Sequence, residues 1–187
     1  HPTADDSADG RARRAAALVD LVVRKYAPLP AASLTYLARL LGYGAPHLKT
    51  QIQAALGQAR EALPSCRIDG VTWYWPAGED PNGRRHVVDD QVRLLAPFDP
   101  VVWDRRRFEL LWGWTYKFEA YTPAAKRMFG YYALPMLWQE RVVGWANVAA
   151  RNGRVEAEFG YVERKPKGVD FRNALEDEMQ RMTAFLG

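Results

Sequence analysis

The sequence predicts an α+β protein in which a winged helix precedes an antiparallel β-sheet domain that ends in a C-terminal helix. Three observations lead to this prediction. Three helical patterns and then a hairpin signal occupy the first half of the 187-residue chain. Short segments rich in β-branched and aromatic residues occupy much of the second half, and an amphipathic helical pattern closes the chain.

The first two helices are predicted from apolar spacing and from their stop signals. Residues 1–10 are small and acidic and have no apolar period, so we expect a flexible leader. Apolar residues recur at helical spacing over Arg11–Tyr26. A second helix follows, with Ser33 as its expected cap and Gly42 near its end.

The third helix and the hairpin complete the winged-helix order. Pro46 lies in the expected first turn of this helix, which carries an apolar stripe. Cys66–Trp75 then predicts a β-hairpin that turns on Asp69 and Gly70. In a winged helix the third helix is normally the one that enters the major groove, and the hairpin is the wing. We therefore place a winged-helix domain at residues 11–77.

The second half is predicted to be a separate α+β domain. Residues 78–90 are rich in glycine, proline and charge, so we expect a linker there and a domain over residues 91–187. Asp170–Leu186 has the apolar spacing of a closing helix, and Asn152 with Gly153 is a turn signal. The predicted strands of its antiparallel sheet are Tyr116–Tyr121, Gly130–Leu137, Arg141–Ala150 and Arg154–Glu163.

Composition sets limits on the function. The net charge of +4 permits nucleic-acid binding without demonstrating it. Cys66 has no second cysteine to pair with, and three histidines form no metal-ligand pattern. No apolar run approaches the roughly 20 residues of a membrane span. We expect a cytoplasmic monomer with no cofactor and no metal.

Cations interleaved with aromatic residues are typical of a surface that binds a phosphate backbone. On the third helix, Lys49 and Gln51 lie on the expected exposed face, as do Gln53 and Arg60, although such a face often only packs against another domain. The expected DNA contacts are Arg105, Arg106, Arg107, Lys117, Lys126, Arg127, Lys49 and Gln51. The alternative for Lys126 and Arg127 is an ion pair with Glu109 or Glu119.

Some aspartates and aromatic residues could take part in catalysis or base stacking, but we favour a structural role for most of them. Asp99 and Asp104 lie beside the arginine run, where a carboxylate could stabilise an oxocarbenium-like sugar. An aspartate before a turn or a helix start is more often a cap. Five aromatic residues could stack on an extruded base: Trp112, Trp114, Tyr131, Tyr132 and Trp145. Most of them are expected in the core, and at most one or two are expected to touch nucleic acid.

Two phrases of the chain resemble the C-terminal region of the AlkZ/YcaQ family of winged-helix DNA glycosylases. LLAPFDPVVWDRRR at residues 94–107 is similar to the family phrase LLSPFDxLVWDRxR. YTPAAKRMFGYYALP at residues 121–135 is similar to YxPAxKRxxGYYxLP, and the order and spacing of the two phrases also agree. The resemblance covers about the last hundred residues, and the first half matches only at the level of a winged helix.

The resemblance implies a monofunctional glycosylase that hydrolyses the N-glycosidic bond of alkylated bases in double-stranded DNA, with interstrand crosslinks as a further substrate of some members. A Gln-x-Gln or Gln-x-Asp motif, in a context such as LGLLQxD, is thought to position the water. This chain lacks that context and has no Met before His1, so we expect the catalytic region to lie outside it. Gln51 and Gln53 spell the motif, but helical residues two apart point about 200° apart, so their amides would not converge.

Two rival interpretations stay open. One is a non-enzymatic winged-helix DNA-binding or regulatory protein, with the fold kept and the chemistry lost. The other is a module whose aromatic surface meets a protein partner. The salt dependence of binding distinguishes the two. Affinity that rests on phosphate contacts falls steeply as the salt concentration rises, whereas affinity that rests on apolar docking does not.

Overall fold

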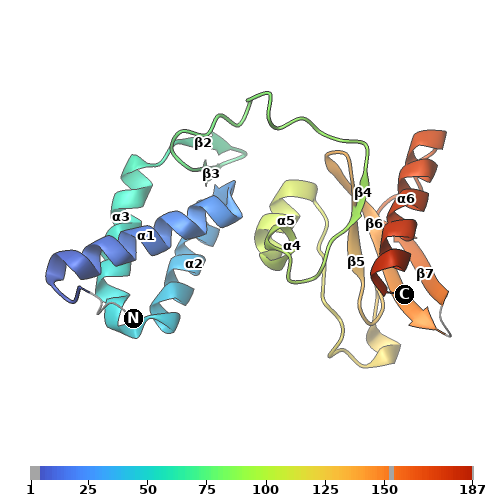
Figure 1. The fold of residues 1–187 in the computed structure, drawn as a ribbon, viewed down its shortest axis with the longest axis horizontal. Coiled ribbons are helices and arrows are strands. Elements are labelled where there is room, and N and C mark those ends of the chain that lie inside the picture. Colours follow the sequence, from blue (N-terminus) through green and yellow to red (C-terminus); the bar gives the residue numbers. More distant parts are fainter. Residues whose placement is uncertain (1–4, 152–153, 187) are drawn as a thin grey trace. The chain divides into compact units, whose positions relative to one another are not determined.

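The chain divides into two compact units, residues 1–83 and residues 84–187, which we describe one at a time. A computed structural model describes residues 5–151 and 154–186. Three helices followed by a hairpin make up the first unit, and a four-stranded antiparallel sheet with a C-terminal helix makes up most of the second (Figure 1). The predicted α+β class is confirmed.

The first unit is held by the apolar faces of its helices. These helices are α1 (Ala8–Tyr26), α2 (Ala31–Gly44) and α3 (Lys49–Ala62), with a short 3-10 turn, η1 (Pro46–Leu48), before α3. Their inward side chains form one core because buried positions recur at helical spacing. The fully or almost fully buried members include Ala15, Val19, Val23, Leu34, Leu37, Leu48, Ile52 and Leu56.

The hairpin turns where the sequence predicts it. Strand β2 (Ser65–Ile68) pairs with β3 (Val71–Tyr74), and the two residues between them, Asp69 and Gly70, both have positive φ. That backbone twist matches the twist of the flanking strands. A two-residue strand, β1 (Leu29–Pro30), pairs with the other edge of β3.

The pairing of β1 also explains why Ser33 is not a helix cap. Helix α2 begins at Ala31, directly after β1, so Ser33 lies inside its first turn. Its side chain is buried, and its hydroxyl has no hydrogen-bond partner. The prediction of a serine cap was wrong because the start of α2 is set by strand pairing, which the local sequence does not reveal.

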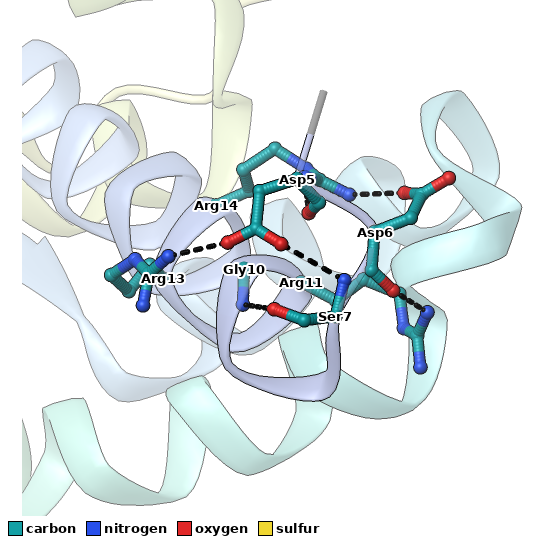
Figure 2. A network of polar contacts seen from close by, with 7 residues as sticks. All are labelled: Asp5, Asp6, Ser7, Gly10, Arg11, Arg13 and Arg14. Carbon is teal, nitrogen blue, oxygen red and sulfur yellow. Dashed lines mark hydrogen bonds and ion pairs between the residues drawn. The ribbon is translucent and has the colours of Figure 1, made fainter. Parts of the chain in front are cut away.

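Helix α1 begins three residues before the predicted start at Arg11. Ser7 caps it by accepting a hydrogen bond from the Gly10 N–H at 3.0 Å. Asp5 pairs with Arg13 at 2.6 Å, and Asp6 pairs with Arg14 at 2.9 Å (Figure 2). The pKa of Asp5 lies below its ordinary value because Ser7 hydrogen-bonds to the carboxylate and Arg13 lies beside it. Part of the predicted leader is thus paired with α1, and residues 1–4 lie outside the described residues.

The second unit is a sheet with the strand order β4-β5-β6-β7. Its strands are β4 (Val92–Leu94), β5 (Leu134–Trp138), β6 (Arg141–Arg151) and β7 (Arg154–Tyr161), and every neighbouring pair is antiparallel. The predicted turn at residues 152–153 lies outside the described residues. The sheet begins at β4, a strand that the sequence did not indicate.

Each face of this sheet has its own apolar cluster, because successive side chains of a strand point to opposite faces. On one face Met136 meets Phe171 and Ala174 of α6 (Val169–Leu186). On the other face pack α4 (Pro100–Trp103) and α5 (Arg105–Trp112), whose core residues Val102 and Phe108 meet Val142 (Figure 1).

A buried carboxylate ties α6 to the edge strand. Glu178 is 8% exposed, and its carboxylate accepts the Leu94 N–H at 2.8 Å. Arg181 pairs with the same carboxylate and donates to the Val92 carbonyl at 3.0 Å. The outer backbone groups of β4 therefore bond to α6, which protects this edge from pairing with another chain.

The predicted strand at Tyr116–Tyr121 is absent. Residues 114–119 have no regular secondary structure, although Trp114 and Tyr116 are buried. The Tyr116 hydroxyl donates to the Ala133 carbonyl at 2.6 Å, so this segment is anchored through side chains and not through a β-ladder. Aromatic composition indicated burial correctly and strand pairing wrongly, because an irregular segment can also bury aromatic rings.

Phe108 is predicted to be essential for the second unit. It is fully buried, and its ring lies 4.8–5.9 Å from the rings of Trp112, Trp114 and Tyr116. Phe108→Ala should lower the free energy of unfolding by about 3–5 kcal/mol, measured by urea denaturation. Leu110→Ala on the same helix, 44% exposed, should cost less than about 1 kcal/mol, and equal losses would contradict this packing.

Candidate nucleic-acid interface

Two of the three arginines at the start of α5 bond to the protein itself. Asp104 caps the helix by accepting the Arg107 N–H, as predicted, and Asp99 caps α4 by accepting the Val101 N–H at 2.7 Å. The Arg107 side chain is 3% exposed and donates to the Pro100 carbonyl. Its guanidinium is not available to a phosphate.

Arg105 is also engaged internally. It donates to the carbonyls of Pro97 and Val102, and its guanidinium lies 4.4 Å from the centre of the Tyr116 ring. Partial burial lowers the pKa of Arg105 below its ordinary value. Burial also raises the pKa of Tyr116 to about 12, so its hydroxyl stays protonated. Of the three predicted arginine contacts, Arg106 alone is exposed.

The loop that follows, residues 119–132, forms no strand pairing. Two side chains hold its backbone by hydrogen bonds. One is Glu119, 4% exposed, whose carboxylate accepts the Met128 N–H at 2.8 Å and the Phe129 N–H at 2.7 Å. Because these backbone groups form no strand pairing, the carboxylate provides the acceptor that they need.

The second is Asn147 of β6. Its amide donates to the Phe129 carbonyl at 2.7 Å and accepts the Tyr132 N–H at 3.3 Å. Gly130 between them has a φ of 112°, and a Cβ there would lie 2.4 Å from the Asn147 amide nitrogen. The loop can pass this close to β6 only with glycine at this position.

A row of aromatic rings results, which we name the aromatic surface and define as Phe98, Phe118, Tyr121 and Tyr132. Phe118 is half-buried, and the other three are exposed. The Phe118 ring lies 5.4 Å from Phe98, 6.1 Å from Tyr121 and 5.3 Å from Tyr132, all edge to face. Phe98 is 63% exposed, Tyr121 93% and Tyr132 42%. Exposed aromatic rings held in a fixed arrangement are typical of an interaction surface.

Cations lie in the segments that carry the aromatic surface. Lys117 precedes Phe118, and Lys126 ends the 3-10 turn η2 (Ala124–Lys126); both are exposed. The Arg127 guanidinium lies 5.0 Å from the centre of the Tyr131 ring, and its Nε donates to the Thr122 carbonyl at 2.8 Å. Arg127 is therefore held on the loop and is half-exposed.

Neither acid considered as a partner for these cations pairs with them. The Glu119 carboxylate is bonded to the loop backbone, and Glu109 accepts a hydrogen bond from the Thr115 hydroxyl at 2.6 Å. Lys126 and Arg127 form no ion pair within residues 5–151 and 154–186. Their charges stay uncompensated beside the aromatic surface.

In the first unit, α3 is a regular helix whose exposed face carries Lys49 and Gln53. Ile52 is fully buried, Gln51 is half-buried and Gln53 is exposed. The two glutamines therefore point in different directions on either side of a core residue, as the helical spacing predicts. Arg60 donates to the Thr35 hydroxyl.

The larger aromatic residues behave as core, as expected. Trp114 stacks on Trp145 with ring centres 5.7 Å apart, and Phe129 packs edge-on against both. The residues that sequence reasoning missed are Glu119 and Asn147. Their signal would have been a polar side chain next to an irregular aromatic segment, which local patterns do not single out.

The described residues, 5–151 and 154–186, hold neither a metal-binding cluster nor a membrane-spanning helix. No group of three or more His, Cys, Asp or Glu side chains in that part of the chain could hold a metal ion. None of its helices combines the length and apolar character that a membrane crossing requires.

Comparison with known families decides the affiliation. The model of the family described as "DNA glycosylase AlkZ-like" matches residues 1–185. The chain belongs to this family. The match includes the first unit, whose sequence alone resembled the family only in the order of its elements. No solved structure matches the chain significantly. A role related to DNA-repair glycosylases follows, and it implies DNA as the partner.

Glu119 is predicted to be the main anchor of the loop in this AlkZ-like chain. Glu119→Ala would leave the Met128 and Phe129 N–H groups without their acceptor, so the free energy of unfolding should fall by about 2–3 kcal/mol. Amide hydrogen exchange at these two residues should accelerate. Glu109→Ala, which removes one exposed carboxylate, is the control and should change neither measurement appreciably.

Unchanged exchange at Met128 and Phe129 in the Glu119 variant would show that other contacts hold the loop.

Proposed function

We propose that this chain is the DNA-binding portion of a glycosylase that hydrolyses the N-glycosidic bond of alkylated bases, and that the aromatic surface meets double-stranded DNA. The observation that carries the proposal is the conjunction of exposed rings with unpaired cations. Phe98, Tyr121 and Tyr132 are exposed, while Lys117 and Lys126 lie in the same segments.

Each component has a known role in nucleic-acid binding. Lysine and arginine that contact phosphates release counterions, which supplies affinity without reading the sequence. An exposed aromatic ring stacks on an unpaired base with about 1–3 kcal/mol per base. A glycosylase has to take its target base out of the stack, so a rigid aromatic surface beside the phosphate contacts suits that task.

In the second unit we propose fewer phosphate contacts than the sequence predicted. Arg106, Lys117, Lys126 and Arg127 remain as phosphate contacts, whereas Arg105 and Arg107 support the fold around α5. Arg127 would contribute through the part of its guanidinium that Thr122 and Tyr131 leave exposed.

We also propose that the first unit binds DNA as a winged helix, with α3 as the helix nearest the groove. Lys49 and Gln53 are its best-exposed polar side chains, and Gln51 is half-buried and less accessible. Such side chains contact phosphates or base edges when a helix docks in the major groove.

The alternative, a DNA-binding or regulatory protein, differs from the glycosylase proposal in having no catalytic activity. Gln51 and Gln53 diverge on α3, and the Asp99 and Asp104 carboxylates cap helices. These arrangements favour binding without base excision by this chain, with the water-activating residues supplied elsewhere in the glycosylase. They equally suit a DNA-binding or regulatory protein without enzymatic activity, which we keep as the second candidate.

The setting that we propose is the cytoplasm, with the chain acting as a monomer and handling either single lesions or interstrand crosslinks. Cys66, the one cysteine of the sequence, is exposed and free, which suits a reducing compartment.

The cations and the aromatic rings should contribute to DNA binding independently of each other. Lys126→Gln should weaken binding to a duplex about fivefold. It should also make the negative slope of log K against log salt shallower by about 0.9. Tyr121→Ala should weaken binding about tenfold to a duplex with one unpaired base and leave the salt slope unchanged. Fluorescence anisotropy at several salt concentrations measures both quantities.

The matched control for Tyr121→Ala is Phe185→Ala, which removes an 83% exposed aromatic side chain from the end of α6. It should leave the affinity unchanged. Equal effects of the two alanine variants would contradict the role of the aromatic surface, and a protein-interaction module would then be favoured if salt had no effect.

Base release distinguishes binding from excision. Incubation of the chain with duplex DNA methylated at N7 of guanine and N3 of adenine should release no more base than a sample without protein, measured by chromatography. Robust release would contradict the proposal of binding without excision, and the loss of that release in Gln51→Ala or Gln53→Ala would then locate the catalytic amides.

A further inference from the structure

The second unit, residues 84–187, carries another basic site in addition to the cations near the aromatic surface. It is a cavity of about 500 Å³ between the start of β6 and the end of β7. Its wall combines the start of β6 at Arg141 with the segment that leaves β7, residues 162–167. Trp112 of α5 and Trp138 of β5 also line it. None of the basic residues that line it was among the DNA contacts expected from the sequence.

The cavity concentrates positive charge. Arg141, Arg164, Lys165 and Lys167 line it, against one acid, Glu163. None of these four cations takes part in an ion pair or a side-chain hydrogen bond within the part of the chain that the structure describes. Like charges gathered at one hollow repel each other, so the arrangement is stabilised when an anion binds there.

Other arginines of the same unit behave differently. Arg93 pairs with Asp89 at 2.5 Å, and Arg181 pairs with Glu178 at 2.8 Å. The four cations of the cavity have no such carboxylate partner among the described residues.

The walls that carry the cations are fixed. The Trp112 indole N–H donates to the Glu140 carbonyl at 2.9 Å, and the Trp138 indole N–H donates to the Asp90 carbonyl at 3.2 Å. The Val162 N–H donates to the Val143 carbonyl at 3.0 Å, so the segment after β7 begins attached to β6. Pro166 restricts the backbone between Lys165 and Lys167.

We infer that this cavity binds phosphate groups of a DNA strand, as a contact separate from the aromatic surface. Arginine forms paired hydrogen bonds to phosphate oxygens and lysine acts as a point charge. The two indoles add apolar area that a sugar or base can cover and that an inorganic ion cannot use. The inference rests on the proposed function, because it assigns a further contact for the same DNA partner.

The test uses the full chain and one fluorescent duplex. Arg164→Gln and Lys167→Gln are the cavity variants, and each should weaken binding about fivefold and lower the salt slope by about 0.9. The matched control is Arg172→Gln, which removes an exposed arginine from α6 outside the cavity. It should change the affinity less than twofold, with the same slope as the unmodified chain.

The outcomes separate the two proposals. If the cavity variants bind as the Arg172 control does while Lys126→Gln still weakens binding, the cavity site is wrong and the proposed function stands. If the unmodified chain does not bind the duplex, the proposed function itself fails. If calorimetry finds inorganic phosphate binding that Arg164→Gln abolishes without an effect on DNA affinity, the site serves a small anion and the inference is overturned.

Discussion

The candidate interface depends on hydrogen bonds between two side chains, Glu119 and Asn147, and the backbone of residues 128–132. Residues 114–119 and 127–133 form no helix or strand, so their backbone groups need partners outside regular secondary structure. A buried carboxylate supplies acceptors for two N–H groups, and one amide supplies both a donor and an acceptor. With those groups bonded, an irregular segment can keep a fixed shape.

That fixed shape sorts the aromatic residues of the segment into two sets. Trp114, Tyr116 and Phe129 point into the cluster around Phe108 and stabilise the unit. Tyr121 and Tyr132 are exposed, and each contacts the half-buried Phe118 edge to face. An ordered exposed ring costs less conformational entropy on binding than a mobile one, so a rigid loop suits recognition. Stability and binding thus use neighbouring residues of one segment.

Much of the fold was predictable from the sequence because its signals are local. Apolar spacing predicted the four long helices, the Asp69-Gly70 pair predicted its hairpin, and Asp104 was correctly expected to be a cap. The strand expected at Tyr116–Tyr121 was wrong because its aromatic residues fill a core without pairing. Strand β4 was missed because three residues that pair with β5 across some forty positions carry little pattern of their own.

The candidate site was less predictable. The arginine run looked like three equivalent cations, yet Arg105 and Arg107 bond to carbonyls of the preceding turn while Arg106 is exposed. Which guanidinium turns inward depends on where α4 ends, and local sequence does not determine that. Glu119 and Asn147 lie 28 positions apart and meet only through the loop between them, so spacing could not associate them.

The most direct measurement of the central claim is a nuclear magnetic resonance titration of the labelled chain with duplex DNA. We expect the amide signals of Lys117, Tyr121, Lys126 and Tyr132 to shift together as duplex is added, and the signals of the outer face of α6 to stay in place. Shifts confined to α6, or none at all at a DNA excess, would contradict the assignment of the aromatic surface to DNA.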